Sequence, residues 1–217
     1  MIEWVIKIGG SLFPNHAIKL AEALEGQNCL IVVGGGEFAN LIRKYDSNIG
    51  FSNDVTHETA INSMDILAKL LNDKLAFTEL SASFEEAETI SSSGKIPIML
   101  CSDIILNEES LKHSWEITSD SIATFIANEL DSNILIATDV DGIYNKNPSE
   151  TDAKLINEIG VRKLLSFNES SIDLMLPVLL EEYGFDCYVV NGKFPDRILS
   201  IIQNENCEFP YTFINNQ

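Results

Sequence analysis

Short apolar runs rich in Ile and Val alternate along this chain with segments whose apolar residues recur at helical spacing. The runs are Trp4–Ile8, Cys29–Val33, Ile96–Leu100, Ile134–Ala137 and Cys187–Val190, and the helical segments are Ala17–Leu24, Phe38–Tyr45, Glu58–Leu75, Ser119–Glu129 and Ile172–Tyr183. Strands that alternate with helices pair in parallel, and right-handed crossovers place the helices on both faces of the sheet. The alternation therefore predicts an α/β fold, a three-layer αβα sandwich with a mainly parallel central sheet. Residues 1–217 contain no linker or repeat, which indicates a single domain.

The charge of the chain limits the partners that we expect it to bind. Its 33 acidic and 14 basic side chains give a formal net charge of −19, which would repel nucleic acids and anionic membranes. The sequence shows neither a secretory leader pattern nor an apolar run long enough to span a bilayer. Its cysteines are scattered and form no CxxC pair, as is typical of buried, reduced thiols. We therefore expect a soluble, cytoplasmic protein without a nucleic-acid or membrane partner.

Glycine clusters follow the first two predicted strands. Gly9-Gly10-Ser11 follows Trp4–Ile8, which contains Lys7, and Gly34-Gly35-Gly36 opens directly into a helical segment. Paired glycines let the backbone approach a ligand closely, and the following helix adds its N-terminal dipole, so such turns can cradle phosphate. For a single cluster, a tight turn with positive φ is the better explanation, but two clusters at neighbouring strand ends favour a phosphate site. Neither cluster has the spacing of a P-loop or of a dinucleotide-binding fingerprint.

The stretch NILIATDVDGIYNKNP, Asn133 to Pro148, passes from a buried strand into acidic and turn-forming residues. Asp139 and Asp141 superficially suggest a calcium loop, but EF-hand spacing would require an oxygen ligand at Ile143 and a glycine at Tyr144. The alternative is a loop at the carboxyl end of a parallel strand, which is where open α/β sheets bind ligands. The stretch therefore predicts a ligand-binding loop.

Four segments in this order, VIKIGGSLF, IVVGGGEFAN, ITSDSIA and IATDVDGIYNKNP, resemble the motifs of the amino acid kinase family over Ile2 to about Arg197. The resemblance implies a three-layer αβα sandwich, ATP and Mg²⁺ as cofactors, and phosphoryl transfer to a small phosphate or carboxylate acceptor. It implies an acceptor-binding side at about residues 1–130 and a nucleotide-binding side at about residues 131–217. It also implies a homodimer or a higher homo-oligomer.

The resemblance also implies roles for individual residues. Lys7 and the backbone of Gly10 and Gly35 would stabilise the transferred group, and Asp120 would orient Lys7. An N-cap is the alternative role for Asp120, and the two roles can coexist. The nucleotide would lie against Gly9, Ser11, Thr138, Asp139, Asp141, Gly142, Tyr144, Asn145 and Pro148. The acceptor would lie against Gly34, Gly35, Gly36, His57 and Ser119, with a surface or helix-capping position as the alternative for His57. No residue is assigned to a protein-bound metal.

One segment departs from the family pattern. The family presents a second lysine in a glycine-methionine-lysine segment, but here that region reads SSIDLMLP, Ser170 to Pro177, without a lysine. Lys146, Lys163 and Lys193 are candidates to replace it, and a single lysine with Mg²⁺ is another solution. A non-catalytic protein that binds a nucleotide or an oxoanion is therefore an open alternative.

Three further segments bear on the acceptor. THETAINSMDILAKLL, SWEITSDSIA and VVNGKFPDRI resemble a branch of the family that phosphorylates aminomethylfuran phosphate to the diphosphate in methanofuran synthesis. A phosphate acceptor is already ionised and needs no general base. Kinases of isopentenyl phosphate, uridylate or a small amino acid are the alternatives within the family.

Overall fold

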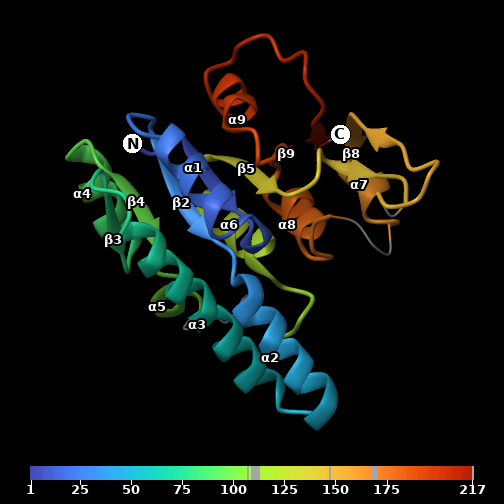
Figure 1. The fold of residues 1–217 in the computed structure, drawn as a ribbon, viewed down its shortest axis with the longest axis horizontal. Helices are drawn as coiled ribbons and strands as arrows, with labels where there is room; N and C mark the ends of the chain where they lie inside the picture. Colours follow the sequence, from blue (N-terminus) through green and yellow to red (C-terminus); the bar gives the residue numbers. More distant parts are fainter. Residues whose placement is uncertain (107, 109–112, 147, 168–170, 217) are drawn as a thin grey trace.

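A central sheet organises the computed structural model, which describes residues 1–106, 108, 113–146, 148–167 and 171–216. The strand order is β3-β4-β2-β1-β5-β9-β10-β8 (Figure 1). The strands are β1 (Trp4–Ile8), β2 (Cys29–Val33), β3 (Thr78–Ser81), β4 (Ile96–Met99), β5 (Asn133–Thr138), β8 (Glu158–Gly160), β9 (Cys187–Asn191) and β10 (Thr212–Asn215). Neighbouring strands pair in parallel except for β9 with β10. The predicted mainly parallel sheet is confirmed.

Helices cover both faces of this sheet (Figure 1). On one face, α1 (Asn15–Ala23) and α9 (Pro195–Ile202) share a core cluster with part of α3 (Asn53–Asn72). On the other face lie α4 (Phe84–Ser92), α5 (Ser102–Ile105), α6 (Ser119–Glu129), α7 (Val161–Leu164) and α8 (Leu176–Tyr183). The three-layer αβα sandwich is therefore confirmed.

Side chains of β1 alternate between the two faces of the sheet, as strand geometry requires. Trp4, Ile6 and Ile8 belong to the core cluster of α1 and α9, whereas Val5 belongs to the cluster of α6 and α8. Lys7 follows Val5 by two residues, so its side chain leaves the strand on the side of α6.

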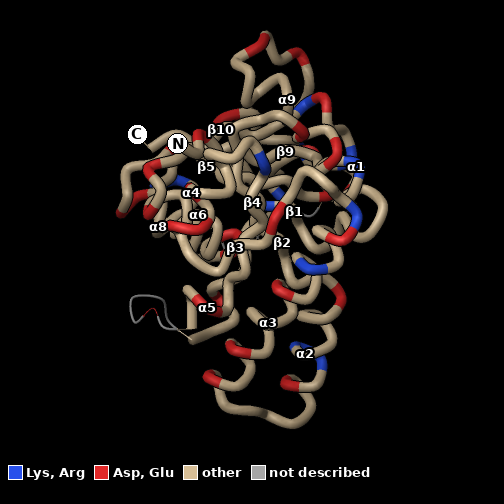
Figure 2. Tube along the Cα trace, turned by 90° about the vertical axis from the view of Figure 1, so that its left-hand side faces the viewer, with Lys and Arg blue, Asp and Glu red and all other residues tan. Residues whose placement is uncertain are grey.

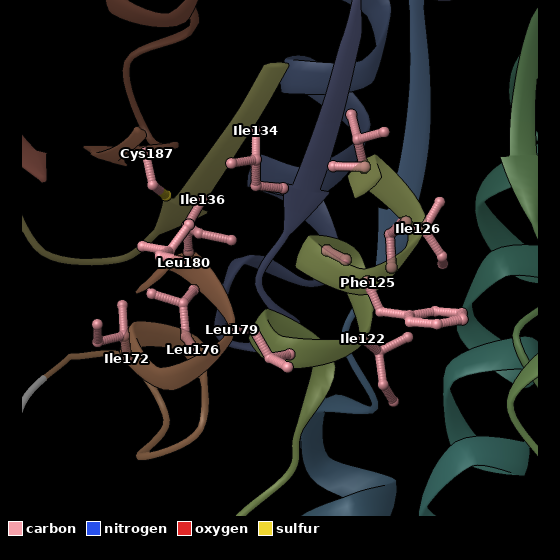
Figure 3. Packing of buried hydrophobic residues seen from close by; sticks show 14 of the residues in the cluster. Ile122, Phe125, Ile126, Ile134, Ile136, Ile172, Leu176, Leu179, Leu180 and Cys187 are labelled. Carbon is pink, nitrogen blue, oxygen red and sulfur yellow. The ribbon is translucent and has the colours of Figure 1, made fainter. Parts of the chain in front are cut away.

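The layer of α6 and α8 is packed with aliphatic and aromatic side chains (Figure 3). The buried residues are Ile122, Phe125 and Ile126 of α6, Leu176, Leu179 and Leu180 of α8, and Ile134 and Ile136 of β5. Because protein interiors are close-packed, this layer fixes the first turns of α6 and α8 over the sheet.

A helical hairpin of α2 (Gly36–Ile49) and α3 extends away from the sheet (Figure 1). Gly50, with φ of 76°, ends α2, and the hydroxyl of Ser52 accepts a hydrogen bond from Val55 N at 3.4 Å to cap α3. No residue of α2 is buried. Exposed apolar side chains along the hairpin are Phe38, Leu41, Tyr45, Ile49, Phe51, Val55, Ile66 and Leu70. We call these residues the hairpin patch.

Each predicted strand is present with ends within one residue, whereas the bounds of the predicted helices differ more. The predicted helix Ile172–Tyr183 begins only at Leu176, because the Asp173 carboxylate accepts hydrogen bonds from Met175 N and Leu176 N and because Pro177 occupies the first turn. Helix α2 is longer at both ends than the predicted segment Phe38–Tyr45. Helix α3 starts five residues before the predicted segment Glu58–Leu75 and ends three residues before its end. The sequence pattern did not predict the sheet strands β3, β8 and β10 or the helices α4, α5, α7 and α9. It also did not predict the separate pair β6 (Ile143–Tyr144) and β7 (Leu155–Ile156).

Acidic residues are distributed along most of the trace, and lysines and arginines are fewer (Figure 2). A buried lysine in the central strand of the sheet is therefore unusual for this molecule. No described helix is both long enough and apolar enough to cross a bilayer.

Candidate active site

The carboxyl ends of β2, β1, β5 and β9 meet along one edge of the sheet. Backbone hydrogen bonds join them, from Gly34 N to Ile8 O at 2.9 Å, from Gly9 N to Ala137 O at 2.8 Å and from Gly192 N to Thr138 O at 2.7 Å. Both glycine clusters and the loop after β5 are therefore neighbours, as expected from parallel strands. The N–H of Gly9 is used within the sheet, so it is not free for a phosphate as the sequence had led us to expect.

The two glycine clusters contact each other directly. A Cβ on Gly10 would overlap the backbone of Gly36, and a Cβ on Gly34 would lie 2.8 Å from Gly10 N. Gly36 also has φ of 56°, in the left-handed region that glycine adopts without strain. Positive φ and close backbone approach therefore both explain the glycines here, and their contact with phosphate stays a prediction.

Lys7 and Asp120 form an ion pair at this edge, with Lys7 Nζ 2.6 Å from Asp120 Oδ1. Lys7 is 8% exposed and Asp120 5% exposed, so water screens their attraction poorly. Burial raises the pKa of the Asp120 carboxyl, the Lys7 ammonium opposes that rise, and the Asp173 carboxylate adds to it. The expected contact is present, and the geometry suits an aspartate that orients a lysine.

Asp120 does not cap α6. It lies in the first turn of the helix with its carboxylate directed to Lys7. The capping group is the Asp173 carboxylate, which accepts hydrogen bonds from Thr118 N at 2.9 Å and from Ser121 N at 3.0 Å. The N-cap alternative for Asp120 is therefore wrong, because a residue far along the chain takes that position.

A pocket of about 280 Å³ opens beside the glycine clusters. One face of α2 lines the pocket, with the residues Gly36, Ala39, Asn40 and Arg43. One face of α3 lines it as well, with the residues His57, Ala60, Ile61 and Met64. Further wall residues are Gly10, Ser11, Gly34, Gly35, Ser114, Trp115, Ile117, Thr118, Ser119 and Ile122. All residues predicted to bind the acceptor therefore line one pocket. Ser11, predicted for the nucleotide, lines it as well.

His57 is buried in the wall of this pocket. Its Nε2 atom has no hydrogen-bond partner among the described residues. Its ring stacks on His113 with centroids 4.6 Å apart, and His113 Nδ1 lies 2.7 Å from Asp54 Oδ1. Burial lowers the pKa of His57, His113 lowers it further and Asp54 opposes the shift. A buried imidazole without a partner is costly, which favours a ligand contact over a surface or capping role.

Trp115 forms another part of the wall, held from two sides. Its indole Nε1 donates to Asp46 Oδ2 at 2.8 Å, and the Arg43 guanidinium lies 4.6 Å from the centre of its ring. The cation–π contact and the hydrogen bond fix both side chains at the pocket. Arg43 thus presents a positive charge beside the glycine clusters.

The loop after β5 is held by the last residue of β9, by the turn that follows it and by α9. Asp141 Oδ1 lies 2.6 Å from Arg197 Nη1 and accepts a hydrogen bond from Asn191 Nδ2 at 3.0 Å. The backbone oxygen of Asp139 accepts one from Lys193 Nζ at 2.9 Å. The predicted nucleotide loop is therefore attached to the turn between β9 and α9.

Several residues predicted to contact the nucleotide have structural roles. Gly142 has φ of 148°, and a Cβ there would lie 2.9 Å from Thr212 N. Asn145 Oδ1 accepts a hydrogen bond from Lys154 N at 2.8 Å, and Tyr144 pairs with Leu155. Pro148 is exposed in a turn, and Thr138 is buried at the end of β5. Their contact with a nucleotide stays a prediction, since chain geometry explains Gly142 and Asn145 without a ligand.

The candidates for a second cation lie in different places. Lys146 contacts Asp152 beyond β6, and Lys163 is exposed on α7. Lys193 lies at the sheet edge through its bond to Asp139. The described part of the departing segment, Ser171 to Pro177, contains no lysine; Ser170 lies outside the described residues.

The sequence matches the profile of the amino acid kinase family over residues 3–183. The chain belongs to the amino acid kinase family. The (5-(aminomethyl)furan-3-yl)methyl phosphate kinase of Methanocaldococcus jannaschii is 36% identical over 93% of this chain and 94% of its own length. A uridylate kinase of the same organism is 30% identical over 91% and 93%. The crystal structure of uridylate kinase from Archaeoglobus fulgidus matches with a TM-score of 0.75 and 24% identity over 98% and 99% of the two chains.

Several residues of the candidate site were not singled out from the sequence. Arg43 had a detectable signal, because it follows Gly36 by two helical turns and so shares its face. Trp115 and His113 lie in an irregular stretch before α6, where no periodicity indicates direction. Asp173 stands in the segment where the family pattern led us to look for a lysine, and its partners are far away in sequence.

Proposed function

We propose that this chain transfers the γ-phosphoryl group of ATP to the phosphate of a small aromatic phosphomonoester that carries an amine, giving ADP and a diphosphate. One observation carries the proposal: the buried Lys7–Asp120 pair lies at the sheet edge beside a pocket that presents Arg43 and His57. Membership of the amino acid kinase family supports the kinase class. The name of the 36% identical relative, an aminomethylfuran phosphate kinase, supports the acceptor class.

The proposed reaction needs positioning and positive charge more than proton transfer. An oxygen of the acceptor phosphate attacks the γ-phosphorus while the bond to the ADP oxygen breaks. The attacking oxygen is already ionised, so no general base is required. Lys7 would neutralise charge on the transferred group, and the amides of Gly10 and Gly35 would face it at the N-terminus of α2.

The acceptor would lie between α2, α3 and residues 114–119. Arg43 suits its phosphate, because a guanidinium donates several hydrogen bonds to phosphate oxygens. His57 would use its unpartnered Nε2 on the same group or on the ring. Trp115 provides an aromatic surface for a planar ring, and the carboxylates of Asp46 and Asp54 stand behind Trp115 and His113, where they favour a cationic acceptor.

The nucleotide would lie along the ends of β5 and β9, at about residues 131–217. Of the three candidate lysines, Lys193 suits the second cation best because it reaches this edge. ATP would enter as its magnesium complex, since Mg²⁺ in kinase sites is bound largely by substrate phosphates with one or two carboxylates. Asp139, which directly follows the last residue of β5, would supply such a carboxylate.

We further propose that the hairpin patch is covered by a second copy of this chain. The patch places exposed Phe38, Leu41 and Tyr45 on α2, a helix without a single buried residue. Contiguous exposed apolar surface of this kind marks interaction sites. Light scattering on the purified protein should give at least twice the monomer mass, and Leu41→Lys should reduce it.

We also place the protein in a reducing cytoplasm, because its thiols are free. Cys29, Cys101 and Cys187 are buried without a disulfide, and burial raises the pKa of Cys29 to about 12. Such thiols are unreactive at neutral pH.

ADP release against a panel of acceptors tests the proposed function. The panel holds the aminomethylfuran phosphate, uridylate, isopentenyl phosphate and aspartate. We expect the highest kcat/KM with the furan phosphate. Higher kcat/KM with uridylate would favour the activity named for the 30% identical relative. ATP binding without turnover of any acceptor would favour a nucleotide-binding protein instead.

A further inference from the structure

Asp173 connects two helices at the active site. At the start of α6, Thr118 donates to the Asp173 carboxylate through its N–H at 2.9 Å and its hydroxyl at 2.8 Å. Ser121 also donates to it, through its N–H at 3.0 Å and its hydroxyl. From its own segment it accepts them from Leu176 N at 2.8 Å and Met175 N at 3.2 Å. One carboxylate therefore satisfies the N-terminal amides of both α6 and α8.

This arrangement replaces the usual local cap of α6. Thr118 occupies the N-cap position, but its side chain caps no amide of the helix and donates to Asp173 instead. A charge at the N-terminus of an 11-residue helix also interacts favourably with the helix dipole. The position of the first turn of α6 is therefore set by a residue outside that helix.

Asp120 lies inside the turn that Asp173 holds. Its neighbours Thr118 and Ser121 both donate to the Asp173 carboxylate. The backbone N–H of Asp173 donates to Asp120 Oδ2 at 3.1 Å, while Asp120 Oδ1 contacts Lys7. Both oxygens of Asp120 thus have defined directions, one toward Asp173 and one toward the ammonium.

We propose that Asp173 is a positioning residue for phosphoryl transfer, which acts through Asp120 to hold the Lys7 ammonium at the reaction site. It stands in the segment where the family pattern has a lysine, and here that segment instead fixes the buried Lys7. The kinetic test of this proposal rests on the kinase activity proposed above. Its spectroscopic test does not require that activity.

The kinetic test is Asp173→Asn, which keeps the shape of the side chain and removes its charge. The expected result is a loss in kcat of about 10-fold to 100-fold, with KM for ATP and for the acceptor changed less than threefold. The double variant Asp120→Asn/Asp173→Asn should lose no more than Asp120→Asn alone, because residues that act as a unit are not additive. Multiplied losses, or a folded Asp173→Asn with unchanged kcat, would overturn the proposal.

Asp65→Asn is the matched control. The Asp65 carboxylate is buried, whereas Asp173 is half-buried, and like Asp173 it accepts hydrogen bonds at the start of a helix: from Cys101 N at 2.7 Å and from the hydroxyl of Ser102 at α5. Its loss should lower the melting temperature and leave kcat within twofold. If Asp65→Asn lost as much kcat as Asp173→Asn, the role of Asp173 would be that of a helix cap only.

Two further measurements keep the proposal testable if Asp173→Asn unfolds or if no acceptor is turned over. Ser121→Ala deletes a single donor to Asp173 and should lower kcat severalfold with little loss of stability. The NMR signal of the Lys7 ammonium in lysine-labelled protein needs no substrate. It should shift in Ser121→Ala and in Asp173→Asn but not in Asp65→Asn, and an unmoved signal in a folded variant would contradict the positioning role. Absent turnover in the wild type with a shifted signal would contradict only the proposed function.

Discussion

The proposed acceptor side and the proposed nucleotide side of this site differ in how many of their polar side chains already have a hydrogen-bond or ion-pair partner. On the acceptor side, His57 Nε2 has no hydrogen-bond partner among the described residues, and the Arg43 guanidinium lies over the ring of Trp115. On the nucleotide side, Asp141 is paired with Arg197, and Lys193 donates to the backbone of Asp139.

This difference indicates two modes of recognition. A side chain with a polar atom that has no hydrogen-bond partner among the described residues, such as His57, would discriminate between acceptors, because it can be satisfied only by a ligand that brings the matching group. The engaged side chains of Asp141, Asn191 and Lys193 instead hold the loop after β5, which we propose faces the nucleotide. Substitutions on the acceptor side should therefore change selectivity, and those on the nucleotide side should change loop stability first.

Lys7 lies between the two sides, and its removal should have the largest effect. Lys7→Ala should lower kcat by about 10²-fold to 10³-fold, the loss typical of a deleted charge-stabilising group in a preorganised site. Steady-state kinetics with both substrates measures it. Lys95→Ala, which removes an exposed partner of Glu79, is the control and should leave kcat unchanged. A similar kcat for Lys7→Ala and the control would remove Lys7 from the mechanism.

Arg43 tests the acceptor side. Arg43→Ala should raise the acceptor KM by about 10-fold to 100-fold, since a charged hydrogen bond contributes about 1.5–3 kcal/mol, while the ATP KM changes little. Arg162→Ala is the matched control, because Arg162 pairs with Glu181 on the exposed surface of α7 and α8. A rise in the ATP KM instead would reverse the assignment of the two sides.

Sequence patterns predicted the sheet more fully than the site. Strands such as Cys29–Val33 are buried on both faces, so an unbroken apolar run identifies them. The glycine clusters and Lys7 were found because they adjoin those strands. Asp173, Trp115 and His113 were not, because their partners lie on elements distant in sequence and only the packed fold brings them together. For the same reason Asp120 could not be distinguished from a cap.

Asp141 tests the nucleotide side. Asp141→Ala and Arg197→Ala should each raise the ATP KM by about threefold to tenfold and lower the melting temperature, and the double variant should do no more, because both remove one pair. The acceptor KM should stay within twofold. A rise in the ATP KM with unchanged melting temperature in Asp141→Ala alone would indicate direct contact between Asp141 and the nucleotide. Gly142→Val is less informative, because its side chain would meet Thr212.

The smallest expected effect is the contribution of His57 to the pH dependence of stability. Burial, aided by His113 and opposed by Asp54, lowers the pKa of His57 below its usual 6.5. The unfolded chain therefore binds the proton more readily, so the stability that neutral His57 supports is present above about pH 6.5 and is lost as the pH falls toward the folded pKa. Melting temperatures between pH 8 and pH 5 should fall more steeply in the wild type than in His57→Gln, which does not titrate. His16→Gln, on α1, is the control. If the acceptor forms a hydrogen bond with His57 Nε2, saturating acceptor should reduce the difference in pH slope between the wild type and His57→Gln. An unchanged difference in the presence of acceptor would contradict a contact between the acceptor and Nε2.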